Sequence, residues 1–153
     1  MSAEARLAEL GIELPSPPRP VANYVPAVRV GELLFLSGHG PLLPDGTRVN
    51  GKLGAEVDVE RGREAARLTA LGLLATLRTE LGSLDRVAGI VKVLGLVASA
   101  PGFGDQPAVL NGCSDLLVEV LGDAGKHARS AVGVAELPSG MCIEIELIAR
   151  VTD

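Results

Sequence analysis

Hydrophobic and polar residues alternate near the end of the chain, between residues 143 and 151. Isoleucine, leucine, alanine and valine take the odd positions, whereas Glu144 and Glu146 take even ones. A period of two is typical of a β-strand with one buried face. The pattern therefore predicts a strand that buries its odd-numbered side chains and carries both glutamates on the opposite face.

A second apolar run, residues 127–138, precedes this strand and contains Arg129. The runs are joined by residues 137–140, Leu-Pro-Ser-Gly, a sequence suited to a turn because proline fixes φ and glycine tolerates positive φ. We expect an antiparallel hairpin with Arg129 opposite Ile148. Arg129 would then share the face of Glu144, roughly 13 Å away along the strand. A slip of one residue would move Arg129 to the other face.

The rest of the pattern predicts a hairpin, a helix, a strand and a second helix before the terminal hairpin. These are strands 25–30 and 33–37 around Gly31-Glu32, a helix from an Asp58 cap to Leu81 with Gly82 as its stop, a buried strand 88–98, and a helix from about Gln106 to Gly122. This order predicts an α+β fold with two helices on one face of a mixed sheet. Since no segment remains to cover the other face, we expect the chain to self-associate.

Residues 1–22 are expected to precede the main domain as a short helix and a strap. Ser2 to Leu10 can form the helix, and four prolines between positions 15 and 20 force extended backbone. We interpret the strap as packing. Residues 23–153 are then a single domain, of a size that buries roughly two-thirds of its unfolded surface.

Composition excludes several classes of function. The 153 residues carry a net charge of −5, and aromatic residues make up only 2%. Nucleic-acid binding is therefore disfavoured, because it relies on positive charge and stacking rings. The sequence also has no apolar run long enough to span a membrane and no basic leader. We expect a soluble cytoplasmic protein.

The two histidines and two cysteines invite a metal interpretation. His39, Cys113, His127 and Cys142 stand at intervals that match no local ligand pattern, so we predict no metal site. Both cysteines lie in apolar segments, where a free buried thiol is ordinary packing. A histidine in a cleft can instead move protons near neutral pH, and His39 is a candidate for that role.

Short motifs spaced along residues 23–151 are more specific than these single positions. They are Asn23-Tyr24-Val25, Leu36-Ser37-Gly38, Asn111, Ala128-Arg129-Ser130, Leu137-Pro138 and Ile143-Glu144-Ile145-Glu146. Together they resemble the Rid family, the reactive intermediate deaminases of YjgF type that are often labelled endoribonuclease L-PSP. The resemblance implies a chorismate-mutase-like fold assembled as a homotrimer with clefts between subunits. It also implies hydrolysis of small enamine and imine carboxylates, such as 2-aminoacrylate, to a 2-keto acid and ammonia, without a metal or organic cofactor.

The resemblance also implies roles for individual residues. Arg129 would clamp the substrate carboxylate, for which a planar guanidinium is well matched. Glu144 would hold and activate water beside the imine carbon. The remaining substrate-binding positions would be Tyr24, Ser37, Gly38, His39 and Asn111, with Asn111 supporting the strand that bears Arg129.

Three positions depart from the common family pattern. His39 stands where glutamine is common, Ala131 where many deaminases carry cysteine, and His127 where proline is frequent. These departures resemble a side branch of the family whose substrates are poorly defined, so Arg129 could bind a different carboxylate. The leading alternative is a non-catalytic trimer that binds a small 2-keto acid for regulation. A ribonuclease and a purely structural trimer are further alternatives.

Overall fold

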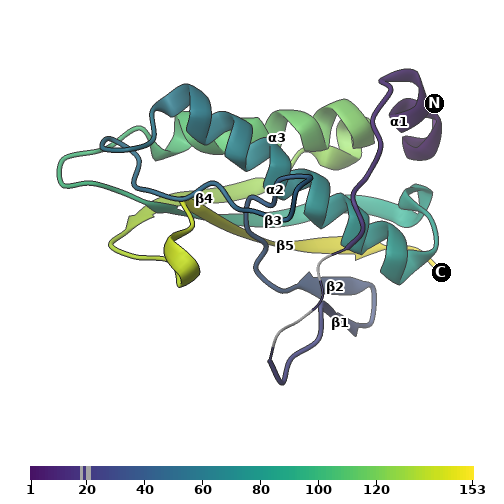
Figure 1. Cartoon of the computed structure of the whole chain (residues 1–153). Coiled ribbons are helices and arrows are strands. Elements are labelled where there is room, and N and C mark those ends of the chain that lie inside the picture. Colours follow the sequence, from purple (N-terminus) through teal and green to yellow (C-terminus); the bar gives the residue numbers. More distant parts are fainter. Residues whose placement is uncertain (18, 20–21) are drawn as a thin grey trace.

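A computed structural model describes residues 1–17, 19 and 22–153. Two long helices lie on one face of a five-stranded mixed sheet with the strand order β1-β2-β5-β3-β4 (Figure 1). The elements are α1 (Ala3–Glu9), β1 (Ala27–Val30), β2 (Leu33–Leu36), α2 (Val59–Leu81), β3 (Val87–Ala98), α3 (Gln106–Leu121), β4 (Ala128–Val134) and β5 (Ile143–Val151), with 3-10 turns η1 (Leu84–Arg86), η2 (Gly122–Gly125) and η3 (Pro138–Gly140). The α+β prediction with two helices on one face is confirmed.

The predicted boundaries of both long helices are confirmed. The Asp58 carboxylate caps α2 by accepting a hydrogen bond from the Arg61 amide, and Gly82 ends the helix with φ of 81°. Helices α2 and α3 approach each other at Gly112, where a Cβ would collide with the Arg63 carbonyl. Because the helices cross closely, the buried leucine and alanine side chains of α2 pack against α3 and the sheet.

The first hairpin is also as predicted. Strands β1 and β2 pair antiparallel around Gly31, whose φ of 59° suits the turn. Strand β2 then pairs antiparallel with β5, which carries the hairpin into the main sheet. Leu34 and Leu36 point to the helices and are buried, whereas Phe35 points to the opposite face and is exposed.

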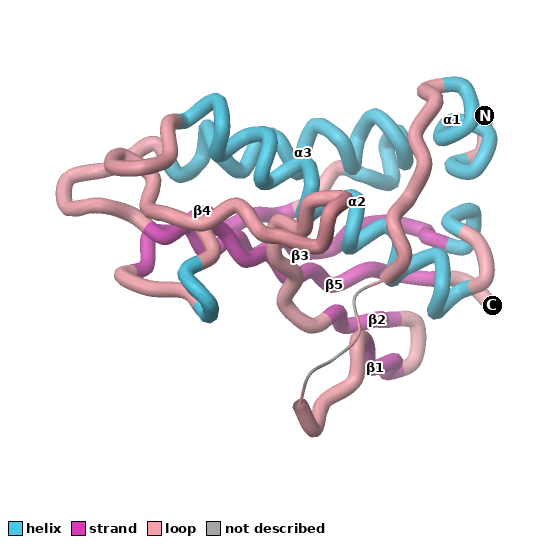
Figure 2. The backbone as a smooth tube through the Cα atoms, in the orientation of Figure 1, coloured by secondary structure: helices cyan, strands magenta, loops and turns pink. Residues whose placement is uncertain are grey.

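The predicted terminal hairpin is wrong. A tight turn does lie at residues 138–140, but β4 and β5 do not pair, because β3 lies between them (Figure 2). Strand β4 pairs parallel with β3, and β5 pairs antiparallel with the other edge of β3. Sequence adjacency suggested a local hairpin, but β3 offers β5 a longer apolar partner strand.

The position of Arg129 changes with this topology. Arg129 is level with Val93 of β3, and Val93 is level with Leu147 of β5 rather than with Ile148. Residues at one level in neighbouring strands share a face, so Arg129 points to the helix side with Val93 and Leu147. Glu144 is level with Leu96 and points to the open side. The predicted shared face of Arg129 and Glu144 is therefore wrong.

The N-terminal helix is docked onto the domain. The Glu4 amide donates to the Asp85 carboxylate at 3.1 Å, and the Glu4 carboxylate accepts from the Leu84 amide at 2.9 Å. Leu7 is buried beside these bonds. The helix predicted over residues 2–10 is thus confirmed. The strap that follows runs beside α2 towards β1 (Figure 1); its residues Pro18, Pro20 and Val21 lie outside the described residues.

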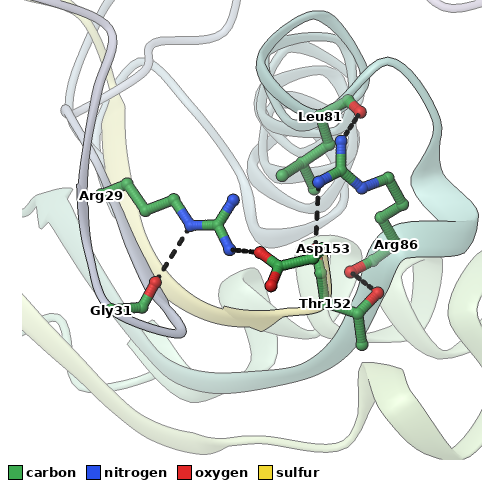
Figure 3. A network of polar contacts seen from close by, with 6 residues as sticks. All are labelled: Arg29, Gly31, Leu81, Arg86, Thr152 and Asp153. Atoms are coloured by element: carbon green, nitrogen blue, oxygen red, sulfur yellow. Dashed lines mark hydrogen bonds and ion pairs between the residues drawn. The ribbon is translucent and has the colours of Figure 1, made fainter.

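Two arginines tie the C-terminal end of β5 to its neighbours (Figure 3). Arg29 donates to the Gly31 carbonyl at 3.0 Å and to the Asp153 carboxylate at 2.7 Å. Arg86 donates to the carbonyls of Leu81 and Thr152 at 2.6 and 3.2 Å. These bonds fix the end of α2 against the last residues of the chain.

In the part of the chain that the structure describes, no helix is long and apolar enough to cross a membrane.

Candidate functional site

Arg129 lies on the edge strand β4 and reaches towards α3. Its Nη1 donates to the Asn111 Oδ1 at 2.9 Å and to the Ser114 Oγ at 3.2 Å. Its Nε and Nη2 have no hydrogen-bond partner among the described residues, yet neither is a buried unsatisfied atom, so both reach solvent. The side chain is held by one nitrogen and presents the other two, which form the edge that pairs with a carboxylate.

Ser114 and His127 extend this network. The Ser114 Oγ lies 2.9 Å from the His127 Nε2, and the His127 Nδ1 lies 2.6 Å from the Gly125 carbonyl. A carbonyl can only accept, so Nδ1 carries the proton, and in the neutral ring Nε2 accepts from the Ser114 hydroxyl. The donors therefore run in one direction, from Arg129 to Ser114 and from Ser114 to His127.

No role was predicted for Ser114, and His127 was identified only as a departure from the family pattern. His127 is half-buried, with both ring nitrogens engaged. The available signal was the spacing of Asn111 and Ser114, which lie one helical turn apart on α3 and therefore on one face. The support predicted for Asn111 is a direct hydrogen bond to the guanidinium.

Glu144 lies on β5 and lines a cavity of about 360 Å³, whose lining also includes Leu68 of α2. Its carboxylate accepts no hydrogen bond from a described residue, and partial burial, followed by the charge of Glu146, raises the pKa of its carboxyl. A Cβ at Gly38 would lie 2.9 Å from the Glu144 Cδ. Glycine at position 38 therefore leaves room for the carboxylate beside the backbone.

Other predicted residues line the same cavity: Tyr24, Ser37, Gly38 and His39. The Ser37 hydroxyl donates to the Val25 carbonyl at 2.7 Å. This bond joins the residues just before β1 to the residues just after β2. Tyr24 is 49% exposed at the rim. The strap, interpreted from sequence as packing, also contributes to the lining through Pro15 and Ser16.

His39 is held on both sides of its ring. It is only 5% exposed, with Nδ1 2.7 Å from the Ser37 carbonyl and Nε2 2.8 Å from the Thr76 Oγ1. Burial lowers the pKa of His39, outweighing the opposing effect of the Ser37 carbonyl. The neutral ring therefore links the cavity wall to α2.

The two sets of residues do not meet within one chain. Tyr24, Ser37, Gly38, His39 and Glu144 gather around the cavity, whereas Arg129 and Asn111 lie at the other edge of the sheet and on its helix side. We call them the acid half-site and the arginine half-site. A small substrate could contact both only if another copy of the chain supplied one of them.

Both cysteines are free and buried. Burial raises the pKa of Cys113 to about 12 and that of Cys142 to about 11, so both remain protonated at neutral pH. Among the residues the structure describes, no three histidine, cysteine, aspartate or glutamate side chains are grouped to hold a metal ion.

Comparison with known proteins agrees with the motifs. Residues 4–150 match the family described as "YjgF/chorismate mutase-like, putative endoribonuclease". Protein TCP17 of Trypanosoma cruzi is 42% identical over 97% of this chain and 94% of its own length. A 2-iminobutanoate/2-iminopropanoate deaminase of Dermatophagoides farinae is 30% identical over 90% of this chain and 92% of its own.

The fold is shared with solved structures. A protein from Shewanella oneidensis, described as a putative endoribonuclease, superimposes with a TM-score of 0.94 at 34% identity, over 99% of this chain and 100% of its own. The similarity thus includes the N-terminal helix and strap as well as the sheet. With the family match over nearly its whole length, this chain belongs to the YjgF/chorismate mutase-like family.

Proposed function

We propose that the protein hydrolyses small imine and enamine carboxylates to 2-keto acids and ammonia. The observation that carries the proposal is the Arg129 guanidinium, whose Nη1 is committed to α3 while Nε and Nη2 remain accessible. A planar pair of donors on a fixed side chain is suited to a carboxylate. The Dermatophagoides relative, named as a 2-iminobutanoate/2-iminopropanoate deaminase, supports the same class of substrate.

The site would be shared between subunits of a homotrimer. The open side of the sheet supports this, because it exposes Val28 (53%), Phe35 (40%) and Val132 (44%) on the face that also carries Glu144. Burying these side chains against a second copy would stabilise the assembly. The arginine half-site of one subunit would then complete the acid half-site of its neighbour. The cytoplasmic location expected from sequence stays a prediction.

The proposed chemistry needs no group beyond the side chains and water. Arg129 would hold the carboxylate next to the C=N carbon, and Glu144 would take a proton from a water that adds its oxygen to that carbon. The nitrogen, once protonated, leaves as ammonia while C=O forms. The raised pKa of Glu144 makes its carboxylate a stronger base than an exposed one, which favours this transfer.

The test is the decay of 2-iminobutanoate and of 2-aminoacrylate, generated freshly in the presence of the purified protein. We expect faster keto-acid release with the wild type and its loss in Arg129→Ala. Glu144→Gln should lower kcat roughly 100-fold or more, while Glu146→Gln, two residues along the same strand and exposed, should retain turnover at neutral pH.

A measurement of 2-oxobutanoate binding distinguishes the hydrolase from the alternative, a non-catalytic regulatory trimer. A regulatory trimer would bind 2-oxobutanoate through Arg129 and would be unaffected by Glu144→Gln. Binding without any acceleration of imine hydrolysis would thus replace our proposal with that one. The endoribonuclease label of the family has little physical support here, since the net charge is −5 and only three aromatic rings are present.

A further inference from the structure

Two guanidinium groups line the cavity beside Glu144, and neither has been given a role above. Arg48 follows a tight loop, and Arg19 belongs to the N-terminal strap. Neither makes a hydrogen bond or an ion pair with a residue that the structure describes, and both are exposed. Among the described residues that line this cavity, Glu144 carries the only carboxylate. The cavity therefore has more positive than negative side chains, although the whole chain is acidic.

The loop that positions Arg48 is well ordered by its own bonds. Leu42 and Arg48 form an antiparallel bridge, and the Leu43 amide donates to the Thr47 carbonyl at 2.8 Å. Asp45 accepts from the Thr47 amide at 2.9 Å and from the Thr47 hydroxyl at 2.6 Å. The nearest carboxylate in sequence is thus occupied within the loop and leaves the Arg48 guanidinium available to a ligand.

The neutral residues of the cavity do not balance this charge. Both ring nitrogens of His39 are engaged by neutral partners, and Ser37 is bonded to a carbonyl. In the proposed shared site, Arg129 of a neighbouring copy would add a third cation. Three guanidinium groups facing one carboxylate suit a substrate with two negative charges better than one with a single charge.

We propose that Arg48, assisted by Arg19, binds a second acidic group on the substrate, so that the preferred substrates are 2-imino dicarboxylates. This inference rests on the proposed function. The carboxylate next to the imine would bind Arg129, and the distal carboxylate would bind Arg48. The reacting C=N carbon would lie between them beside Glu144. Water adds to that carbon, ammonia leaves and the distal acid is unchanged, so the product is a 2-keto dicarboxylate. A cavity of about 360 Å³ has room for the longer side chain.

The experiment compares 2-iminoglutarate and 2-iminosuccinate with 2-iminobutanoate, each generated by an amino-acid oxidase in the presence of the full-length protein. We expect the wild type to have the higher kcat/KM for the dicarboxylates. Arg48→Gln should reduce that preference roughly tenfold, because losing one hydrogen bond between charged groups lowers affinity by about that factor. Arg19→Gln should reduce it less. Arg63→Gln, on the exposed side of α2, is the matched control and should leave the preference unchanged.

A binding measurement separates this proposal from the proposed function. By calorimetry, 2-oxoglutarate should bind more tightly than 2-oxobutanoate, and Arg48→Gln should remove the difference. If no imine is hydrolysed but this difference in affinity is found, the proposal that Arg48 binds a second acidic group stands and the hydrolase proposal fails. The second acidic-group site at Arg48 is overturned if 2-iminobutanoate is hydrolysed at least as well as the dicarboxylates and Arg48→Gln changes neither the substrate preference nor the affinity for 2-oxoglutarate. The hydrolase proposal would stand in that case.

Discussion

The arginine half-site and the acid half-site hold their charged groups in opposite ways. Arg129 is fixed by Asn111 and Ser114 before any ligand binds, whereas the Glu144 carboxylate accepts no hydrogen bond from a described residue. A group that binds gains from a fixed orientation, because less entropy is lost when the ligand arrives. A group that accepts a proton gains from a poorly solvated carboxylate, because its pKa rises towards neutral.

His39 in the acid half-site and His127, which reaches the arginine half-site through Ser114, have the same local pattern of hydrogen bonds. In both, Nδ1 bonds to the carbonyl two residues earlier, and Nε2 meets a hydroxyl from a helix. The difference lies in what the hydroxyl contacts next. Thr76, the partner of His39, is buried in the core, whereas Ser114, the partner of His127, contacts Arg129. The same pattern therefore stabilises the fold in one place and orients a binding group in the other.

The largest expected effect comes from removing the buried histidine. His39→Ala leaves the Thr76 hydroxyl and the Ser37 carbonyl without partners and opens a cavity, so it should cost about 2–4 kcal/mol of unfolding free energy. His127→Ala should cost at most about 1 kcal/mol, because its site is half-buried. Urea unfolding measures both, and equal losses would contradict the contrast between the histidines.

The pH dependence of stability sharpens the same contrast. The folded pKa of His39 lies below its unfolded value of about 6.5, so the unfolded chain binds its proton first. The contribution of His39 is complete above that value and is lost as pH falls from there through the folded pKa. His39→Gln should flatten this part of the stability curve. An unchanged slope would show that other groups cause it.

Glycine substitutions test the space around Glu144 and His39. In Gly38→Ala the new Cβ would lie 2.9 Å from the Glu144 Cδ, so we expect the carboxylate to shift and kcat to fall about tenfold. The matched control is Gly72→Ala in α2, whose Cβ would make an ordinary 3.6 Å contact with the His39 ring. It should stabilise the helix by about 0.5–1 kcal/mol and retain activity. Equal kcat in both variants would argue against a precise placement of Glu144.

The Ser114 to His127 link should affect binding more than turnover. Ser114→Ala removes one of two acceptors for the Arg129 Nη1, so KM should rise about 3- to 10-fold while kcat changes little. His127→Gln should give a smaller change, because glutamine can still accept from Ser114. If Ser114→Ala lowers kcat and leaves KM unchanged, the link does not act through the carboxylate clamp.

The smallest expected effect is a shift in a pH profile. Glu146 is the second cause of the raised pKa of Glu144, so Glu146→Gln should lower that pKa. A base must be ionised to act, so the rate falls as pH drops through its pKa. The acid limb of kcat should therefore move to lower pH in Glu146→Gln. A limb that stays in place would show that burial alone sets it.

Most of the fold could be predicted because its signals are local. The Asp58 cap, the Gly82 stop and the turn at Gly31 act within a few residues, and each is where the sequence indicated. The partner of β4 could not be found in this way. A turn at residues 138–140 is compatible with a hairpin or with insertion of β5 elsewhere, and only the whole sheet decides between them.

The candidate site was predictable in its residues and not in its geometry. Family motifs indicated Glu144, Ser37 and Gly38, which do share one cavity. The face of Arg129 depended on register, where a change of one position, from Ile148 to Leu147, reverses the answer. Ser114 was missed because its spacing from Asn111 places both on one face of α3 but does not show that Arg129 lies opposite that face.

The position of β5 has a consequence for how the protein is made. It is synthesised after the other four strands of the sheet, yet it occupies the middle of that sheet, between β2 and β3. Until it is synthesised, those two strands each present an unpaired edge on which other chains could assemble. Truncation within residues 143–151 should therefore cause aggregation rather than a smaller sheet, and solubility during translation depends on how quickly this segment is inserted.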